Sequence, residues 1–271
     1  MNFSKRKELL LAAISASLKA GKEIIEVYNS TDFEIQIKSD NSPLTIADQR
    51  AHNAIVSVLD ELGVPVLSEE GEKLDYTTRK AWDYCWIVDP LDGTKEFIKR
   101  NDEFTVNVAL IENGKAIAGV IYVPVYQQLY FSDKELGAFL INNIEDWTGT
   151  LDQLVLESEK LPLKQNRSTV RVVGSRSHMS QETTDFIEKL KQEHGEVELI
   201  SKGSSLKLCM IAEGEADVYP RYAPTMEWDI AAGHAIVTAS GGKVLHLNSE
   251  EEISYNKEDL LNPWFICKRD N

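Results

Sequence analysis

Residues 86–94 read Trp-Ile-Val-Asp-Pro-Leu-Asp-Gly-Thr, a short apolar run followed by two carboxylates in a turn. The apolar run predicts a buried strand that ends at Asp89. Pro90 and Gly93 then favour a tight turn, which holds Asp92 near Asp89. Carboxylates held this close repel each other, so the stretch predicts a site for a cation. The structural alternative is a turn in which both aspartates bond only their own backbone.

Two other acidic positions occur next to predicted elements. Glu69 and Glu70 follow a short strand over 64–67, and Asp229 begins a helix of small residues. Carboxylate oxygens are the ligands that Mg²⁺ prefers in proteins. Each position also has a structural alternative, because paired glutamates are common on surface loops and an aspartate often caps the start of a helix. It is the joint occurrence of these positions with the first motif that predicts a Mg²⁺ site.

The composition sets limits on the fold and on the partners. The chain has 271 residues, a formal net charge of −15, 42% hydrophobic residues and 27% charged residues. This length suits two compact domains or one large domain, and the composition is ordinary for a globular protein. The negative charge argues against a nucleic-acid polymer or an anionic membrane as the main partner. A small anionic substrate remains compatible, since bound metal and local cations reverse the sign of the charge within a cleft.

The three cysteines, Cys85, Cys209 and Cys267, lie far apart among apolar neighbours. An odd number of widely spaced cysteines is typical of reduced thiols in a protein core, which predicts a cytoplasmic protein. The sequence contains neither a CxxC nor an HExxH motif, so we expect no zinc site.

The first residues of the chain have two interpretations. The basic triplet at 5–7, followed by an apolar run over 9–14, imitates a signal peptide. Glu8 interrupts that pattern, and apolar residues continue at helical spacing as far as Tyr28. We therefore expect a long amphipathic helix. No apolar run approaches the ~18 residues that a membrane-spanning helix needs.

The order of predicted elements divides the chain into two parts. Residues 1–167 predict an α+β domain in which two helices pack on a largely antiparallel sheet. Within it, residues 142–168 are polar and irregular, which indicates a surface excursion or an interdomain linker. Strands and helices alternate over residues 168–271, which predicts an α/β domain of three layers.

Three motifs together carry a family resemblance. They are Glu69-Glu70, Asp89-Pro90-Leu91-Asp92-Gly93-Thr94 and Trp228-Asp229-Ile230-Ala231-Ala232-Gly233. The set resembles the lithium-sensitive, magnesium-dependent phosphatases of the inositol monophosphatase superfamily, and the resemblance spans nearly the whole chain. It implies a layered α-β-α-β-α sandwich of the sugar (inositol) phosphatase type, built from two sub-domains.

A narrower resemblance is to the CysQ branch, the 3'(2'),5'-bisphosphate nucleotidases. It rests on four segments: Lys38 to Asp48, Ser175 to His178, Lys202 to Lys207 and Tyr219 to Arg221. The branch removes the 3'-phosphate of adenosine 3',5'-bisphosphate, a by-product of sulfate activation, and some members also act on 3'-phosphoadenylyl sulfate or inositol 1,4-bisphosphate. The resemblance implies a small phosphorylated nucleotide as partner. It also allows a cytoplasmic enzyme to associate peripherally with the cytoplasmic face of the inner membrane.

The resemblance implies two or more Mg²⁺ ions and a role for each acidic residue. Glu69, Asp89 and the carbonyl of Leu91 would hold one ion. Asp89, Asp92 and Asp229 would hold a second ion. Two such ions stabilise the attacking and leaving oxygens of an in-line phosphoryl displacement, so Glu69 is also counted as catalytic.

Two further residues match the family's pair that orients and deprotonates the attacking water. These are Thr94, at the start of the helix after the first motif, and Asp48. The alternative for Asp48 is a solvated residue near the start of a helix. Glu70 is expected in the outer surroundings of the site rather than as a ligand.

A bisphosphate substrate needs an anchor for the phosphate that is not cleaved. Arginine offers bidentate contacts to phosphate, and serine hydroxyls add donors. The candidates are Ser175, Arg176, His178, Lys202, Ser204, Ser205, Lys207 and Arg221. The cleaved phosphate would contact Glu69, Leu91, Asp92, Gly93, Thr94 and Asp229. For each lone cation the alternative is a solvated surface charge, and His178 would alternatively cap a helix that begins near residue 180.

Three other functions remain compatible with parts of the sequence. The nearest is an inositol monophosphatase or a fructose-1,6-bisphosphatase. A haloacid-dehalogenase-type phosphatase forms a covalent aspartyl phosphate, but it needs Asp-x-Asp spacing, whereas two residues separate Asp89 from Asp92. A calcium-binding or metabolite-sensing module would bind without hydrolysis, but the sequence has no EF-hand pattern.

Overall fold

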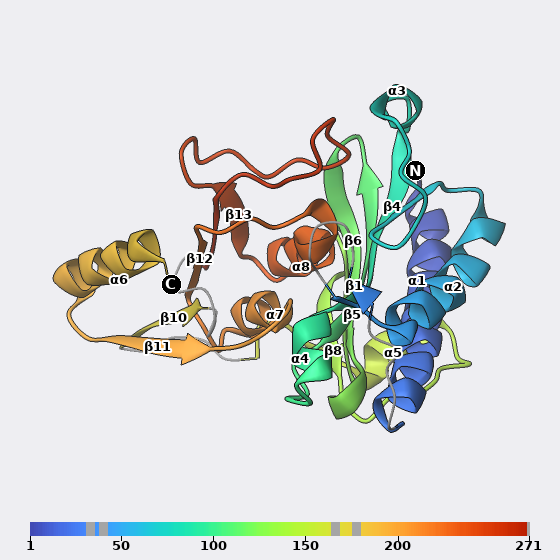
Figure 1. The fold of residues 1–271 in the computed structure, drawn as a ribbon, viewed down its shortest axis with the longest axis horizontal. Coiled ribbons are helices and arrows are strands. Elements are labelled where there is room, and N and C mark those ends of the chain that lie inside the picture. Colours follow the sequence, from blue (N-terminus) through green and yellow to red (C-terminus); the bar gives the residue numbers. More distant parts are fainter. Residues whose placement is uncertain (31–35, 38–42, 164–168, 175–179, 270–271) are drawn as a thin grey trace.

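The computed structural model describes residues 1–30, 36–37, 43–163, 169–174 and 180–269 (Figure 1). The helices are α1 (Phe3–Tyr28), α2 (Ile46–Leu59), α3 (Tyr76–Arg79), α4 (Thr94–Ile98), α5 (Leu151–Glu157), α6 (Gln181–His194), α7 (Leu206–Glu213) and α8 (Glu227–Ala239), with 3-10 turns η1 (Asp60–Leu62) and η2 (Pro124–Tyr126). The strands are β1 (Gln36–Ile37), β2 (Pro43–Leu44), β3 (Val66–Ser68), β4 (Tyr84–Asp92), β5 (Thr105–Glu112), β6 (Lys115–Val123), β7 (Gln128–Asp133), β8 (Gly137–Ile141), β9 (Glu159–Lys160), β10 (Val170–Gly174), β11 (Val197–Ser201), β12 (Val218–Arg221), β13 (Lys243–His246) and β14 (Phe265–Lys268).

The first half of the chain forms a seven-stranded sheet in the order β3-β4-β5-β6-β7-β8-β9. Its strands are antiparallel except for the parallel pair β3–β4. Side chains alternate between the two faces along each strand. On β4, Val88 therefore joins the core beneath α1 and α2, whereas Ile87 joins the core on the opposite face. The prediction of two helices on a largely antiparallel sheet is confirmed.

A second sheet has five strands in the order β11-β10-β12-β14-β13. Helices α7 and α8 lie between the two sheets, and α6 lies at the far end of the molecule (Figure 1). The layers are thus α1 and α2, the first sheet, α7 and α8, the second sheet, and α6. This arrangement confirms the predicted α-β-α-β-α sandwich. The predicted division at residues 167 and 168 lies in a part of the chain outside the described residues and stays a prediction.

Helix α8 packs unusually close to the first sheet because β6 presents a glycine there. A Cβ atom added to Gly119 would lie 2.4 Å from the carbonyl oxygen of Ala232. Any larger residue would push the helix outward. Small residues on both elements therefore bring the start of α8, with Asp229, toward the strand that carries Asp89.

Two parts of the fold differ from the sequence analysis. Residues 142–168 were expected to be irregular, but Leu151–Glu157 form helix α5 and Glu159–Lys160 pair with β8. The helix begins with a capping box between Thr150 and Gln153, and its Leu154 is fully buried. A one-turn apolar contact of this kind is too short to stand out as a periodic pattern. The second difference is β14, a strand not predicted, which pairs with both β12 and β13.

No helix in the described part of the chain is both long and apolar enough to cross a membrane.

Candidate active site

The first motif lies at a bulge in the pairing of β4 with β5. Asp89 is opposite Asn107, and Asp92 is opposite Thr105, so three steps along β4 match two steps along β5. In a regular strand, residues three apart point to opposite faces. The extra residue in β4 cancels that difference, as a β-bulge does. Both aspartates are therefore registered against neighbours that share one face of β5.

Gly93 makes the turn that follows the bulge. Its φ of +96° lies in the left-handed region, and a Cβ atom there would lie 3.0 Å from the carbonyl oxygen of Glu103. Only glycine adopts this conformation without strain and also tolerates the close approach. The chain then enters α4 directly, with Thr94 as its first residue.

Three carboxylates from distant segments meet beside this turn. One oxygen each from Glu69, Asp89 and Asp229 lies within 4.8 Å of the other two. Glu69 comes directly after β3, Asp89 lies on β4, and Asp229 lies in the first turn of α8. Among the described residues, this is the one group of acidic, histidine or cysteine side chains close enough to hold a metal ion. An acidic cluster of this composition suits a hard cation with oxygen ligands.

The electrostatics of the cluster are unfavourable without a cation. Burial raises the pKa of Asp89 well above its usual value, and the carboxylates of Glu69, Asp92, Asp229 and Asp48 raise it further. Burial also raises the pKa of Asp229 to about 8, with the charge of Asp92 as the next cause. The structure gives neither Asp89 nor Asp229 an ion pair with a described residue. A bound divalent cation would compensate the negative charge.

Backbone groups orient the two buried aspartates of the cluster. Oδ1 of Asp89 accepts a hydrogen bond from the backbone N–H of Leu91 at 3.1 Å. Oδ2 of Asp229 accepts from the backbone N–H of Met226 at 2.9 Å, which caps α8. These are the turn and cap contacts of the structural alternatives. They use one oxygen of each carboxylate, so they fix its orientation and are compatible with a cation at the other oxygen.

A second carboxylate contact fixes Thr94 beside the cluster. The hydroxyl of Thr94 lies 3.1 Å from Oδ1 of Asp48 and 3.3 Å from the carbonyl oxygen of Leu91. Asp48 is only 2% exposed, and its Oδ2 accepts from both the backbone N–H and the hydroxyl of Thr45 at the start of α2. The predicted pair of Thr94 and Asp48 is thus in direct contact. Its catalytic role stays a prediction.

Asp92 lies next to the cluster but is not one of its three members. Its Oδ2 accepts from the hydroxyls of Ser204 at 2.7 Å and Ser205 at 2.8 Å. Both serines were predicted as substrate-binding residues. In the structure their hydroxyls contact the protein's own carboxylate, so they surround the site from behind Asp92.

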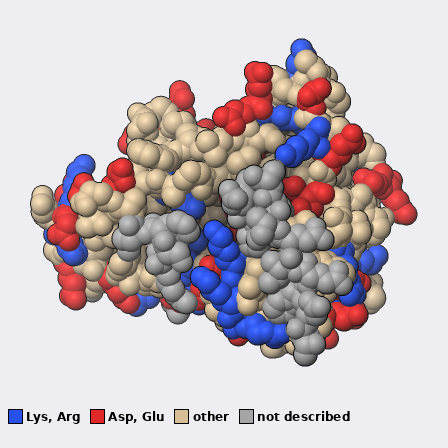
Figure 2. Space-filling view, in the orientation of Figure 1, with Lys and Arg blue, Asp and Glu red and all other residues tan. Residues whose placement is uncertain are grey.

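A cleft of about 340 Å³ opens from Asp92 and Asp229 toward positively charged side chains. Its cationic lining comprises Lys95, Lys99, Lys207 and Arg221. Figure 2 shows that Lys and Arg side chains gather around α4, on a molecule whose formal net charge is −15. Local charge at the cleft is therefore opposite in sign to the charge of the whole chain, which suits an anionic ligand.

Two of the predicted cations line the inner part of this cleft. Lys207 is buried, and burial lowers its pKa to about 8. Its Nζ donates to the carbonyl oxygen of Ser204 at 2.5 Å. Nε of Arg221 is shielded from solvent and has no hydrogen-bond partner among the described residues. A buried guanidinium N–H without a partner is costly, and an anion in the cleft would satisfy it.

The remaining predicted substrate residues have different positions. Lys202 is half-exposed and lies 3.5 Å from the carboxylate of Glu103. Ser175, Arg176 and His178 lie outside the described residues.

The sequence analysis did not identify four residues at the site. Lys95 and Lys99 lie four positions apart on α4, directly after the first motif, so their spacing was a usable signal. Thr105 and Asn107 are buried polar residues that alternate with valines on β5. Polar residues inside an apolar strand indicate buried hydrogen bonds, although the sequence does not reveal their partners.

Comparisons with known proteins place the chain in a family. A model of the inositol monophosphatase family matches residues 5–269. The 3'(2'),5'-bisphosphate nucleotidase CysQ of Escherichia coli (strain K12) is 44% identical over 250 residues, which cover 91% of this chain and 94% of that protein. The crystal structure of CysQ from Bacteroides thetaiotaomicron is 55% identical, with a TM-score of 0.91 and 98% of each chain covered. Staphylococcal IMPase-II, at 18% identity and a TM-score of 0.70 over 97% of this chain and 88% of its own, shares the fold. The chain belongs to the inositol monophosphatase family.

Proposed function

We propose that this protein is a Mg²⁺-dependent 3'(2'),5'-bisphosphate nucleotidase, which hydrolyses the 3'-phosphate of adenosine 3',5'-bisphosphate to give AMP and phosphate. The observation that carries the proposal is the buried cluster of Glu69, Asp89 and Asp229 at the end of a cation-lined cleft. The relatives named CysQ, at 44% identity over most of the chain, support the choice of nucleotide. The related substrate 3'-phosphoadenylyl sulfate would place the enzyme in sulfur metabolism. The cytoplasmic location and peripheral membrane association stay predictions.

The acidic cluster has the chemistry that Mg²⁺ requires. Its donors are carboxylate oxygens, and the raised pKa of Asp89 reflects burial and negative neighbours that a divalent cation would offset. Glu69, Asp89 and the carbonyl of Leu91 would hold one ion, and Asp89, Asp92 and Asp229 a second. When bound, these ions supply a lowered pKa for water and stabilise charge on the phosphoryl oxygens.

Thr94 and Asp48 would handle the proton of the attacking water. Because the Thr94 hydroxyl donates to Oδ1 of Asp48, its oxygen keeps lone pairs that accept a hydrogen bond from water. A proton that passes from the water to Thr94 moves on to Asp48, whose other oxygen is held by Thr45. Asp48 therefore acts as the general base at one remove, and no histidine is needed. Backbone N–H groups of Gly93 and Thr94, at the start of α4, would orient the phosphate.

The cations of the cleft would hold the 5'-phosphate. Arg221 and Lys207 are placed for this task, because one has an unsatisfied buried Nε and the other lines the inner cleft. Arginine binds phosphate through two parallel hydrogen bonds. We include Lys202, and Ser175, Arg176 and His178 from outside the described residues, on the basis of the family resemblance. Ser204 and Ser205 stay candidates for substrate contact as well.

The experiment is a phosphate-release assay with four substrates. They are adenosine 3',5'-bisphosphate, 3'-phosphoadenylyl sulfate, inositol 1-phosphate and fructose 1,6-bisphosphate, each with Mg²⁺ and with EDTA. We expect kcat/KM to be highest for adenosine 3',5'-bisphosphate and activity to disappear in EDTA. A preference for inositol 1-phosphate would replace the nucleotide by a sugar phosphate as substrate. Metal binding without hydrolysis of any of the four would favour a binding module.

A further inference from the structure

Four buried polar residues lie directly behind Asp92 and form one hydrogen-bonded network. Thr105 and Asn107 come from β5, and Ser204 and Ser205 precede α7. Thr105 is fully buried and Asn107 is 1% exposed. None of these groups faces the apolar core alone, because each side chain has a partner within the network. A fully satisfied buried polar network of this kind is rigid.

The network begins at Thr105, which orients the amide of Asn107. The Thr105 hydroxyl donates to Oδ1 of Asn107 at 2.9 Å. This contact fixes which end of the amide carries the N–H groups. Nδ2 of Asn107 then faces the hydroxyl of Ser205 at 2.9 Å and Oδ2 of Asp92 at 3.5 Å. Asn107 thus supplies donors toward Asp92 from the neighbouring strand.

Ser205 connects Asp92 to the start of α8. Its hydroxyl oxygen lies 2.8 Å from Oδ2 of Asp92 and 2.7 Å from the carbonyl oxygen of Asp229. The same oxygen accepts from Asn107. One hydroxyl therefore sets the distance between two residues that belong to the proposed metal site, although they lie on β4 and α8.

Ser204 holds the same carboxylate oxygen from a constrained backbone. Its φ of +52° is in the left-handed region, where serine is uncommon. The loop is fastened there because the backbone N–H of Gly203 donates to the carboxylate of Glu103 at 2.8 Å. The Ser204 hydroxyl lies 2.7 Å from Oδ2 of Asp92 and 2.8 Å from the hydroxyl of Thr105. The loop conformation is thus set so that this hydroxyl reaches Asp92.

We infer that Asn107 and Thr105 are positioning residues that hold Asp92 for a divalent cation through Ser204 and Ser205. The inference rests on the proposed function. All hydrogen bonds that the described residues make to the Asp92 carboxylate converge on Oδ2, which leaves Oδ1 for a cation. Residues that orient metal ligands in this way typically change metal affinity or activity by 10- to 100-fold when they are replaced.

The test measures Mg²⁺ binding by calorimetry in the absence of substrate. We expect Asn107→Ala and Thr105→Val to weaken Mg²⁺ binding by about 10- to 100-fold. Thr105→Ser keeps the hydroxyl and should stay close to wild type. The matched control is Ser132→Ala, because Ser132 is a fully buried polar residue on β7 of the same sheet, and its Oγ has no partner among the described residues.

Two further readouts separate positioning from a structural or substrate-binding role. Thermal unfolding in EDTA reports on the metal-free fold, and the ratio of the variants' Mg²⁺ affinities must not follow it. KM for adenosine 3',5'-bisphosphate at saturating Mg²⁺ should change by less than about 3-fold if the network acts on the metal site. If Asn107→Ala does not fold, the comparison of Thr105→Val with Thr105→Ser decides.

The outcomes for the inference and for the proposed function are distinct. Wild-type protein that neither binds Mg²⁺ nor hydrolyses the nucleotide would overturn both. Wild-type protein that does both, with unchanged Mg²⁺ affinity in Asn107→Ala and Thr105→Val, would overturn the inference alone. A raised KM with unchanged Mg²⁺ affinity would also overturn it and would assign the serine hydroxyls to substrate.

Discussion

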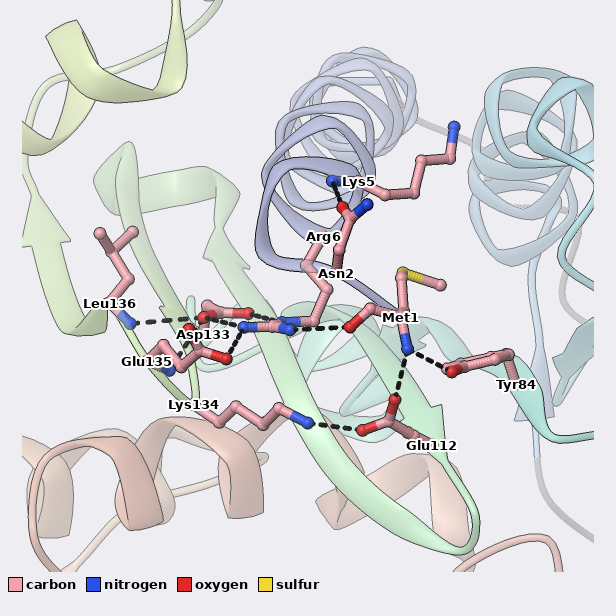
Figure 3. Close-up of polar contacts among 10 residues, drawn as sticks. All are labelled: Met1, Asn2, Lys5, Arg6, Tyr84, Glu112, Asp133, Lys134, Glu135 and Leu136. Atoms are coloured by element: carbon pink, nitrogen blue, oxygen red, sulfur yellow. Dashed lines mark hydrogen bonds and ion pairs between the residues drawn. The ribbon is translucent and has the colours of Figure 1, made fainter.

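Two groups of buried charged residues lie at different places on the first sheet, and they differ in charge balance. At the end of α1, the guanidinium of Arg6 is 2% exposed and pairs with Asp133 at 2.8 Å and Glu135 at 2.6 Å (Figure 3). At the end of β4, Asp89 is 1% exposed and shares its surroundings with Asp229 and other carboxylates. The first group contains its own counter-charge. The second group has none from the described residues at Asp89 or Asp229.

The pKa values of two carboxylates express the same contrast. Burial alone would raise the pKa of Glu112, but hydrogen bonds from Lys134 and the amino group of Met1 bring it down to about 2 (Figure 3). Burial raises the pKa of Asp229 to about 8, and Asp92 adds to the effect. A buried acid with a cationic partner is a stable part of the fold. A buried acid among other acids indicates a site that is completed by a cation from solution.

The largest expected effect comes from Asp89→Asn. The amide keeps an oxygen for the N–H of Leu91 but removes the charge, so kcat/KM should fall by at least about 10³-fold. Because the pKa of Asp89 is raised, its ionisation costs the metal-free fold stability as the pH rises to neutrality. The melting temperature in EDTA at pH 7.5 should therefore increase in the variant.

The control for this variant is Asp185→Asn, at an exposed position on α6. It should leave both activity and melting temperature unchanged. If Asp89→Asn lowered the melting temperature in EDTA, the view of the cluster as an unbalanced charge would be wrong.

The balanced group responds in the opposite way to loss of one charge. Arg6→Met leaves Asp133 buried without its cation, which typically costs about 3–5 kcal/mol of unfolding free energy. Urea denaturation measures this loss, and kcat/KM of the folded fraction should not change. Lys5→Met, next to it and exposed, is the control. Equal stability of the two variants would contradict the assignment of Arg6 as a structural ion-pair partner.

A buried neutral group gives a third type of behaviour. His234 is 5% exposed, its Nδ1 lies 2.8 Å from the hydroxyl of Tyr255, and burial lowers its pKa to about 4. Between pH 6.5 and 4 the unfolded chain binds a proton that the folded protein does not, so this histidine destabilises the fold as the pH falls. The full effect is about 3 kcal/mol over that range.

The measurement is the unfolding free energy at several pH values for His234→Gln and for wild type. The variant should lose less stability on acidification, whatever its stability at pH 7. His194→Gln, at an exposed position near the end of α6, should keep the wild-type pH dependence. An unchanged slope in His234→Gln would show that other groups cause the acid sensitivity.

The smallest effect concerns stabilisation by the metal. A ligand that binds only the folded protein adds about 2.7 kcal/mol at a free concentration 100 times its Kd. Mg²⁺ should therefore raise the melting temperature of wild type in a saturable way. Asp229→Asn should reduce this increase, whereas Arg6→Met should keep it, since Arg6 lies in the balanced group. An equal increase in both variants would place the metal elsewhere.

Much of the fold followed from local patterns in the sequence. Apolar periodicity predicted the long helix α1, and the alternation of strands and helices after residue 168 predicted the second sheet. Helix α5 was missed because its apolar contact is limited to one turn, and β14 because it follows a long irregular segment. Elements held in place by tertiary contacts leave a weak signal in their own residues.

The candidate site divides in the same way. The motif itself showed that Asp89 and Asp92 belong together, and the family resemblance linked them to Glu69 and Asp229. Strand periodicity alone would place Asp89 and Asp92 on opposite faces. Only the pairing of β4 with β5 reveals the bulge that brings both to one side.

What the sequence by itself determined is a set of chemical groups: carboxylates at a strand end, a glycine at the turn and a threonine at the start of a helix. These follow from residue type and short-range spacing. Only the tertiary structure decided which of Asp92's oxygens is held by hydrogen bonds, because Asn107 and Ser205 lie 98 positions apart in the chain. Hydrogen bonds between such distant residues depend on strand register and layer packing, and neither is encoded in a local motif.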